Sequence, residues 1–160
     1  MTKNQTISGG LLKTLFSQFP ADLVYLYGSR ASGNEDSRSD YDFGVLFEDN
    51  LKEKKRFDLR LELFGKIASE LKVSSDIIDL VDLDEVPVLL QFNVIKGIAI
   101  YNKNEERRVS FETEVMRDYH DGHYYLDRYL KETLVKIEKG VFFERGISYD
   151  REKAGEAGGQ

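Results

Sequence analysis

The chain has 160 residues, 41% of them hydrophobic, which suits a single domain with one core. It contains no cysteine, which excludes disulfides, thiolate-bound zinc and cysteine nucleophiles. The net charge of −6 disfavours a polynucleotide partner, because affinity for nucleic acid comes largely from Lys and Arg. Since no apolar run approaches the length of a membrane span and the start lacks the apolar core of a secretion signal, we expect a cytoplasmic protein without membrane association.

The first part of the chain predicts a helix followed by two strands. Apolar residues between Gly10 and Pro20 recur at helical spacing, which predicts a short amphipathic helix. The run 23–27 is apolar and rich in strand formers, so it predicts a buried strand that ends at Gly28. The run 41–47 predicts a second strand for the same reason.

The middle of the chain continues this alternation. Apolar residues from 57 to 71 share one helical face, and the segment 76–83 has apolar residues on both faces, as a central strand would. Asp84 can cap a following helix that has Pro87 in its first turn, and 97–101 predicts a short fourth strand. The order of elements predicts an α/β (α+β) fold, with a mixed sheet of about four strands flanked by helices.

The C-terminal part is helical in pattern from about residue 105 to 140, with Gly122 as the position where the helix could break or kink. We expect a catalytic domain over 1–104, a helical extension that packs on it over 105–146, and a disordered tail over 147–160, where no apolar anchor remains.

The most informative stretch runs from Gly28 to Asp42. Gly28 and Ser29 fall where a buried strand ends, so backbone N–H groups and a hydroxyl are placed to hold phosphate oxygens. Asp40 and Asp42 follow after ten residues, and the alternation of a strand puts both on one face. Because a strand presents such oxygen ligands rigidly to Mg²⁺, the stretch predicts a triphosphate and metal site.

A third carboxylate is expected from the strand at 76–83, where Asp79 and Asp82 are the candidates. They have opposite parity, so only one can face the site. We favour Asp79, because an unpaired charge within the apolar part of a strand would be costly, whereas a turn could solvate Asp82 near the strand's end.

Three other interpretations of these residues fail. The acidic residues over 40–48 resemble a calcium loop, but the glycine is misplaced and the ligand spacing is wrong. Gly28 to Gly33 begins like a P-loop, yet Asn34 stands where the lysine is required. Ser29 as a nucleophile would need a nearby base, and the two histidines are remote in sequence, so phosphate binding is its better role.

Gly28, Ser29, Asp40 and Asp42 meet the signature of a known family, in which Gly-Ser is followed after ten residues by Asp-x-Asp. The chain resembles the minimal nucleotidyltransferases of the DNA polymerase β superfamily. The resemblance extends over roughly residues 8 to 118, and it implies the family's small mixed sheet and nucleotidyl transfer from a nucleoside triphosphate, with ATP as the expected donor.

The resemblance also implies roles for individual residues. Asp40 and Asp42 would bind both of two Mg²⁺ ions, and Asp79 would ligate the first ion and assist deprotonation of the acceptor hydroxyl. Gly28 and Ser29 would hold the β and γ phosphates. The adjacent residue Arg30 would either pair with a phosphate or form a structural ion pair.

The acceptor is a separate question. Many stand-alone members of the family resemble antitoxins that transfer AMP to a tyrosine of a helical HEPN ribonuclease toxin, which is the hypothesis we favour here. The alternatives are transfer to a small hydroxylated molecule such as an aminoglycoside, and a module that masks a partner without catalysis. Tyrosines in the C-terminal helix could form a partner surface or simply cover the sheet. These are Tyr119, Tyr124, Tyr125 and Tyr129.

Overall fold

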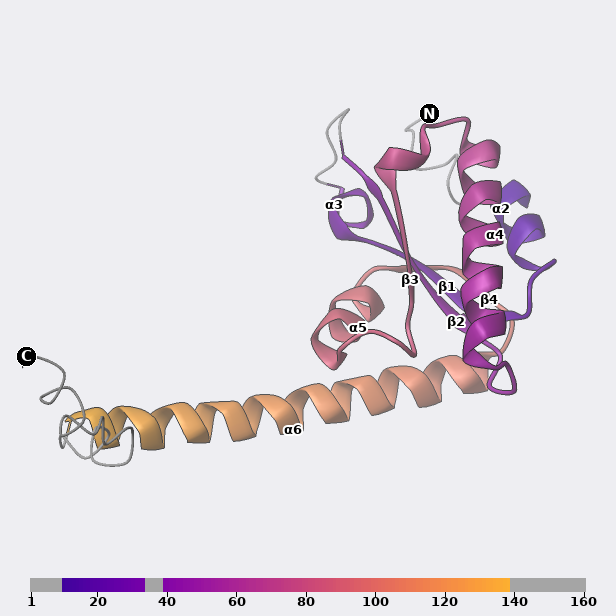
Figure 1. Cartoon of the computed structure of the whole chain (residues 1–160). Coiled ribbons are helices and arrows are strands. Elements are labelled where there is room, and N and C mark those ends of the chain that lie inside the picture. Colours follow the sequence, from indigo (N-terminus) through magenta and orange to yellow (C-terminus); the bar gives the residue numbers. More distant parts are fainter. Residues whose placement is uncertain (1–9, 34–38, 139–160) are drawn as a thin grey trace, which may run out of the picture. The chain divides into compact units, whose positions relative to one another are not determined.

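Four strands form one mixed sheet in the order β3-β2-β1-β4 (Figure 1). The structure, a computed structural model, describes residues 10–33 and 39–138. The central strand β1 pairs antiparallel with β2 and β4, and β2 pairs parallel with β3. The strands are β1 (Ala21–Tyr27), β2 (Tyr41–Phe47), β3 (Ile78–Asp82) and β4 (Ile98–Asn102). The predicted fold class is therefore confirmed.

The helices follow the predicted order, with two short additions that the sequence pattern did not indicate. These additions are α3, directly after β1, and the single 3₁₀ turn η1, which precedes β3 and takes up the first part of the strand predicted from residue 76. The helices are α2 (Gly10–Phe16), α3 (Gly28–Ala31), α4 (Glu53–Leu71), η1 (Ser75–Ile77), α5 (Val88–Ile95) and α6 (Glu105–Glu138).

The two faces of the sheet are covered by different helices. On one face, α2 and α4 lie side by side and bury residues such as Phe16 and Leu63 against Phe43 of β2 (Figure 1). On the other face, α5 and the start of α6 form a second cluster with Leu23 and Leu46. Strand alternation divides the side chains between these faces, so parity along each strand decides on which side a polar residue lies.

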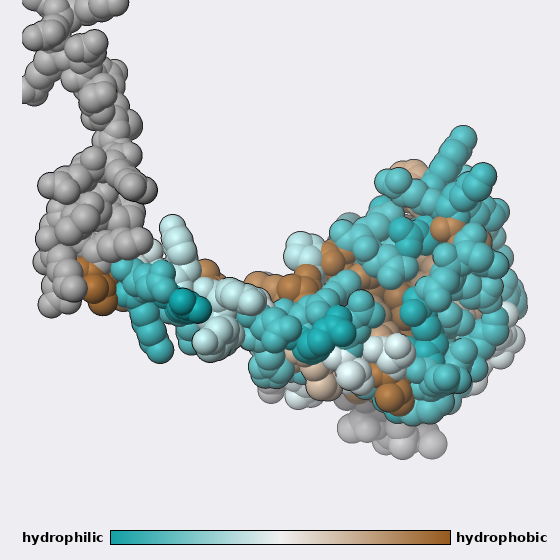
Figure 2. All heavy atoms as spheres, turned by 90° about the horizontal axis from the view of Figure 1, so that it is seen from below, coloured by the Kyte–Doolittle hydropathy of each residue, from teal (hydrophilic) through white to brown (hydrophobic). Residues whose placement is uncertain are grey.

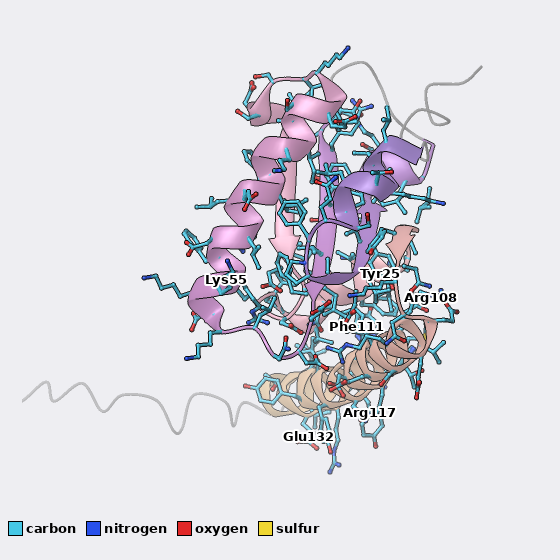
Figure 3. The ribbon with its side chains drawn as sticks, turned by 90° about the vertical axis from the view of Figure 1, so that its right-hand side faces the viewer. Tyr25, Lys55, Arg108, Phe111, Arg117 and Glu132 are labelled. Carbon is cyan, nitrogen blue, oxygen red and sulfur yellow. The ribbon has the colours of Figure 1, made fainter. Side chains whose placement is uncertain are left out.

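The first part of α6 packs on the sheet. Phe111 and Val115 are buried in the second cluster, and the hydroxyl of Tyr25 on β1 donates a 2.8 Å hydrogen bond to Glu112 Oε1. Figure 3 shows Tyr25 and Phe111 on adjoining parts of β1 and α6. One compact unit of the chain therefore extends to Tyr119.

A second compact unit begins at His120. The helix α6 continues from Glu105 to Glu138, so it does not break at Gly122. Within this unit Tyr124, Tyr125 and Tyr129 are exposed, and the rings of Tyr124 and Tyr125 meet edge to face. The tail predicted over 147–160 lies outside the described residues.

Hydrophilic side chains dominate the face drawn in Figure 2, with smaller groups of apolar residues between them. Over residues 10–33 and 39–138, no helix has both the length and the apolar character needed to cross a bilayer.

Candidate functional site

The carboxylates singled out in the sequence meet at one end of the sheet. Asp42 is the register partner of Asp79 on the parallel strand β3 and of Tyr27 on the antiparallel strand β1. Register partners share a face, and Asp40 has the parity of Asp42. Leu46, four residues after Asp42 on β2, has the same parity and belongs to the second cluster. Asp42 therefore lies on the face of the sheet that α5 covers. The fold thus brings Asp40, Asp42 and Asp79 to one edge of that face.

Gly28 places the predicted phosphate turn directly against Asp42. It has a φ of +71°, which glycine adopts without steric cost, and it begins α3 where β1 ends. A Cβ atom built on Gly28 would lie only 2.2 Å from Asp42 Oδ2. The carboxylate and the Gly28-Ser29 turn are therefore in contact, and this contact requires a glycine.

The site concentrates negative charge. Burial is the main cause that raises the pKa of Asp42, and the neighbouring Asp79 and Asp40 raise it further, while Arg30 acts in the opposite direction. Burial, with Asp79 and Asp42, also raises the pKa of the Tyr27 hydroxyl to about 12. Carboxylates that repel one another in this way favour a bound cation.

The donors suit a hard cation such as Mg²⁺, because all are carboxylate oxygens, and two of them, Asp42 and Asp79, belong to paired strands. Among the residues that the structure describes, no group of three or more acidic, histidine or cysteine side chains is arranged to hold a metal ion. The fold brings three carboxylates to one end of the sheet, but their side chains do not converge on a single metal position.

Asp82 has a different role. It lies on the opposite face from Asp79 and is only 1% exposed, with Oδ2 3.4 Å from Arg56 Nε and Oδ1 accepting a 3.0 Å hydrogen bond from the Asp84 amide. Burial raises its pKa. The expectation that a turn would solvate Asp82 is wrong, and it is Asp79 that is exposed, because the α5 face is open at the site while α4 covers the other.

Arg30 lies beside the site and is engaged with the main chain. Its Nε donates to the carbonyl oxygens of Ser39 at 2.9 Å and Asp40 at 3.0 Å, and its guanidinium carbon lies 3.7 Å from the centre of the Tyr41 ring. Sequence reasoning missed Tyr41 and Tyr27 as residues of the site. Their only signal was their position next to Asp42 and Gly28.

A mixed sheet with a Gly-Ser turn at the end of one strand, facing carboxylates on two others, defines a small nucleotidyltransferase fold. Residues 11–106 match the model of the family described as Polymerase beta, Nucleotidyltransferase, and the chain belongs to this family.

Among curated proteins, the chain is similar to the protein adenylyltransferase MntA of Aphanizomenon flos-aquae. The two are 30% identical over 103 residues, which cover 59% of this chain and 65% of that relative.

Solved structures show the same fold. One match is a chain of a toxin–antitoxin crystal structure with AMP-PNP, with a TM-score of 0.62, 22% identity, and coverage of 83% of this chain and 99% of that one. Another is a chain of the tri-AMPylated Shewanella oneidensis HEPN toxin in complex with its MNT antitoxin, with a TM-score of 0.57, 24% identity, and coverage of 82% and 98%.

Proposed function

We propose that this chain is a Mg²⁺-dependent adenylyltransferase that transfers AMP from ATP to a tyrosine hydroxyl of a HEPN ribonuclease toxin and thereby acts as its antitoxin. The observation that carries the proposal is the pairing of Asp42 with Asp79 beside the Gly28-Ser29 turn. Similarity to MntA supports the adenylyl donor and the protein acceptor.

In this reaction the acceptor oxygen attacks the α-phosphorus of ATP, the bond from that phosphorus to the bridging oxygen breaks, and pyrophosphate leaves. Asp40, Asp42 and Asp79 would hold two Mg²⁺ ions, which when bound neutralise the triphosphate and the leaving pyrophosphate. Asp79 accepts the proton of the acceptor hydroxyl. Gly28 and Ser29 hold the β and γ phosphates through backbone N–H and hydroxyl.

The test uses the full chain together with a HEPN ribonuclease as the candidate partner. The two are incubated with Mg²⁺ and ATP labelled in the α or the γ phosphate, and the partner is analysed by intact mass and peptide mapping. We expect α label, and the mass of AMP, on a tyrosine of the partner. Asp42→Asn should abolish the transfer, and Asp82→Asn, which changes a carboxylate on the other face, should not. The four nucleoside triphosphates compared side by side give the base preference.

Two outcomes would overturn the proposal. A partner that binds and is silenced without gaining AMP would mean that the chain masks its target. Label that moves only to small hydroxylated molecules, with an aminoglycoside as the probe, would mean a small-molecule acceptor.

A further inference from the structure

The two metal ligands of the Asp-x-Asp pair are held very differently by the sheet. Asp42 lies within β2 and pairs with Tyr27 on one side and Asp79 on the other. Asp40 precedes β2, and the ladder to β3 begins only at Tyr41, which pairs with Ile78. The sheet therefore fixes the backbone of Asp42 and leaves that of Asp40 beyond its last pair.

Arg30 makes the contacts to this segment that the sheet does not. Its Nε donates to the carbonyl oxygens of Ser39 and Asp40 at 2.9 and 3.0 Å, and Nη2 also donates to Ser39. A guanidinium is suited to this task, because its donors point in a fixed plane and are always charged.

The flat face of the same guanidinium contacts an aromatic ring. It covers the Tyr41 ring at 3.7 Å, and that ring stacks on Phe43, a fully buried core residue, with 6.3 Å between ring centres and 5° between planes. Arg30 thus contacts three consecutive residues, from Ser39 to Tyr41. Of these, Tyr41 packs on the core residue Phe43.

Arg30 belongs to α3, the turn that begins with Gly28 and Ser29. One side chain therefore joins the predicted phosphate turn to the start of the strand that carries the metal ligands. A lysine could not replace it, because an ammonium has no planar donor pair and no face to lay on Tyr41.

We propose that Arg30 is a positioning residue that sets the backbone of Asp40 in line with Asp42 for metal binding, and that it is not a ligand of the triphosphate. The inference rests on the proposed function, since it assigns Arg30 a task at that same site. It differs from both roles that the resemblance implied for Arg30, which were pairing with a phosphate and a structural ion pair.

The test measures Mn²⁺ binding to the full chain by EPR titration without nucleotide. Removing a residue that orients a metal ligand typically costs about 10- to 100-fold in metal affinity, and we expect a loss in this range for Arg30→Ala and Arg30→Lys. Ethylguanidinium added to Arg30→Ala should restore part of the affinity. Arg60→Ala is the matched control, because Arg60 also lies over an aromatic ring and hydrogen-bonds a carboxylate, yet belongs to α4.

A second measurement separates positioning from phosphate binding. The affinity for a fluorescent ATP analogue is followed while Mn²⁺ is raised. If Arg30 acts through the metal ligands, the gap between wild type and Arg30→Ala closes at saturating Mn²⁺. A gap that stays constant at every Mn²⁺ concentration would make Arg30 a phosphate ligand and overturn the proposal, as would unchanged Mn²⁺ affinity.

Melting curves show whether each variant is folded. Tyr41→Leu is a milder change at the same contact, and we expect it to lose less Mn²⁺ affinity than Arg30→Ala.

Asp42→Asn separates the failure of this inference from the failure of the proposed function. If Asp42→Asn loses Mn²⁺ binding while Arg30→Ala does not, only the role of Arg30 is wrong. If Asp42→Asn binds Mn²⁺ as wild type does, the metal site of the proposed function is itself wrong.

Discussion

Asp79 and Asp82 lie three residues apart on β3 and point to opposite faces of the sheet, the first beside Asp42 and the second toward Arg56 on α4. The same chemical change at the two positions should therefore have different effects. Asp79→Asn should lower kcat/KM for AMP transfer at least about a hundredfold, equal to roughly 3 kcal/mol, because it removes a charged ligand of the proposed metal site. Asp82→Asn should leave kcat/KM nearly unchanged.

The measurement is initial-rate transfer of α label from ATP at saturating Mg²⁺, with circular dichroism melts to verify folding of both variants. Equal losses of activity in two folded variants would contradict the assignment of Asp79 to the site.

Gly28→Ala should damage the site through a steric contact. The added Cβ would lie 2.2 Å from Asp42 Oδ2, so the carboxylate must move. A non-glycine residue at a φ of +71° also costs roughly 1 kcal/mol of backbone free energy. Gly33→Ala is a matched control, because Gly33 has a φ of +73° and no described atom lies within 4 Å of the position that its added Cβ would take.

We expect both glycine variants to lose stability in urea denaturation by a similar backbone cost. Only Gly28→Ala should also lose Mn²⁺ affinity and transfer activity. Normal metal binding by Gly28→Ala would show that Asp42 does not need its position against the turn.

The sequence was a good guide wherever local pattern decides geometry. The end of β1 at Tyr27, directly before Gly28, agrees with the boundary expected from the glycine, and Asp42 lies within β2 as the alternation of apolar residues predicted. The reason given for Asp79 was nevertheless wrong. Solvation at that point depends on which helix covers which face, and this is settled by packing between distant segments.

The contacts of Arg30 and Arg56 could not be read from the sequence for a related reason. Arg30 meets Asp40 only because β1 and β2 return to the same end of the sheet. Arg56 meets Asp82 only because α4 packs across the face that β3 presents to it. The local sequence around a charged residue does not indicate its tertiary partner. For Arg30, phosphate pairing and a structural ion pair therefore both stayed open, and no role was predicted for Arg56.

The pKa of Asp42 predicts a pH-dependent stability. Because burial, Asp79 and Asp40 raise this pKa above the usual 3.8, the folded state binds the proton more tightly than the unfolded chain does. The stabilisation from this proton is full below pH 3.8 and is lost as the pH rises through the folded pKa. Asp42→Asn removes the carboxylate, so with EDTA present it should be more stable than wild type at about pH 7.5, by about 1 kcal/mol or less.

That difference should shrink as the pH falls through the raised pKa of Asp42, because wild-type Asp42 then takes up a proton and loses its charge. Urea denaturation followed by circular dichroism at several pH values measures it, with Asp58→Asn on the exposed side of α4 as the control. Lower stability of Asp42→Asn than of wild type at the higher pH would contradict the charge repulsion inferred at the site.

The start of α6 should be essential to the stability of the domain. Phe111 is 6% exposed in the cluster with Leu23 and Tyr25, so Phe111→Ala should destabilise the chain by about 3–5 kcal/mol through lost burial and the cavity left behind. Leu126→Ala, on the same helix but 53% exposed, should change stability by only about 0.5 kcal/mol.

Urea denaturation of the full chain compares the two variants, and a chain ending at residue 104 extends the test. Since that chain lacks Phe111 and Val115 and the Glu112 acceptor of Tyr25, it should lose cooperative unfolding or lie at least as far below wild type as Phe111→Ala does. If it unfolded cooperatively at wild-type stability, residues 1–104 would be a complete domain, and the burial of α6 against β1 would add nothing to its free energy of folding.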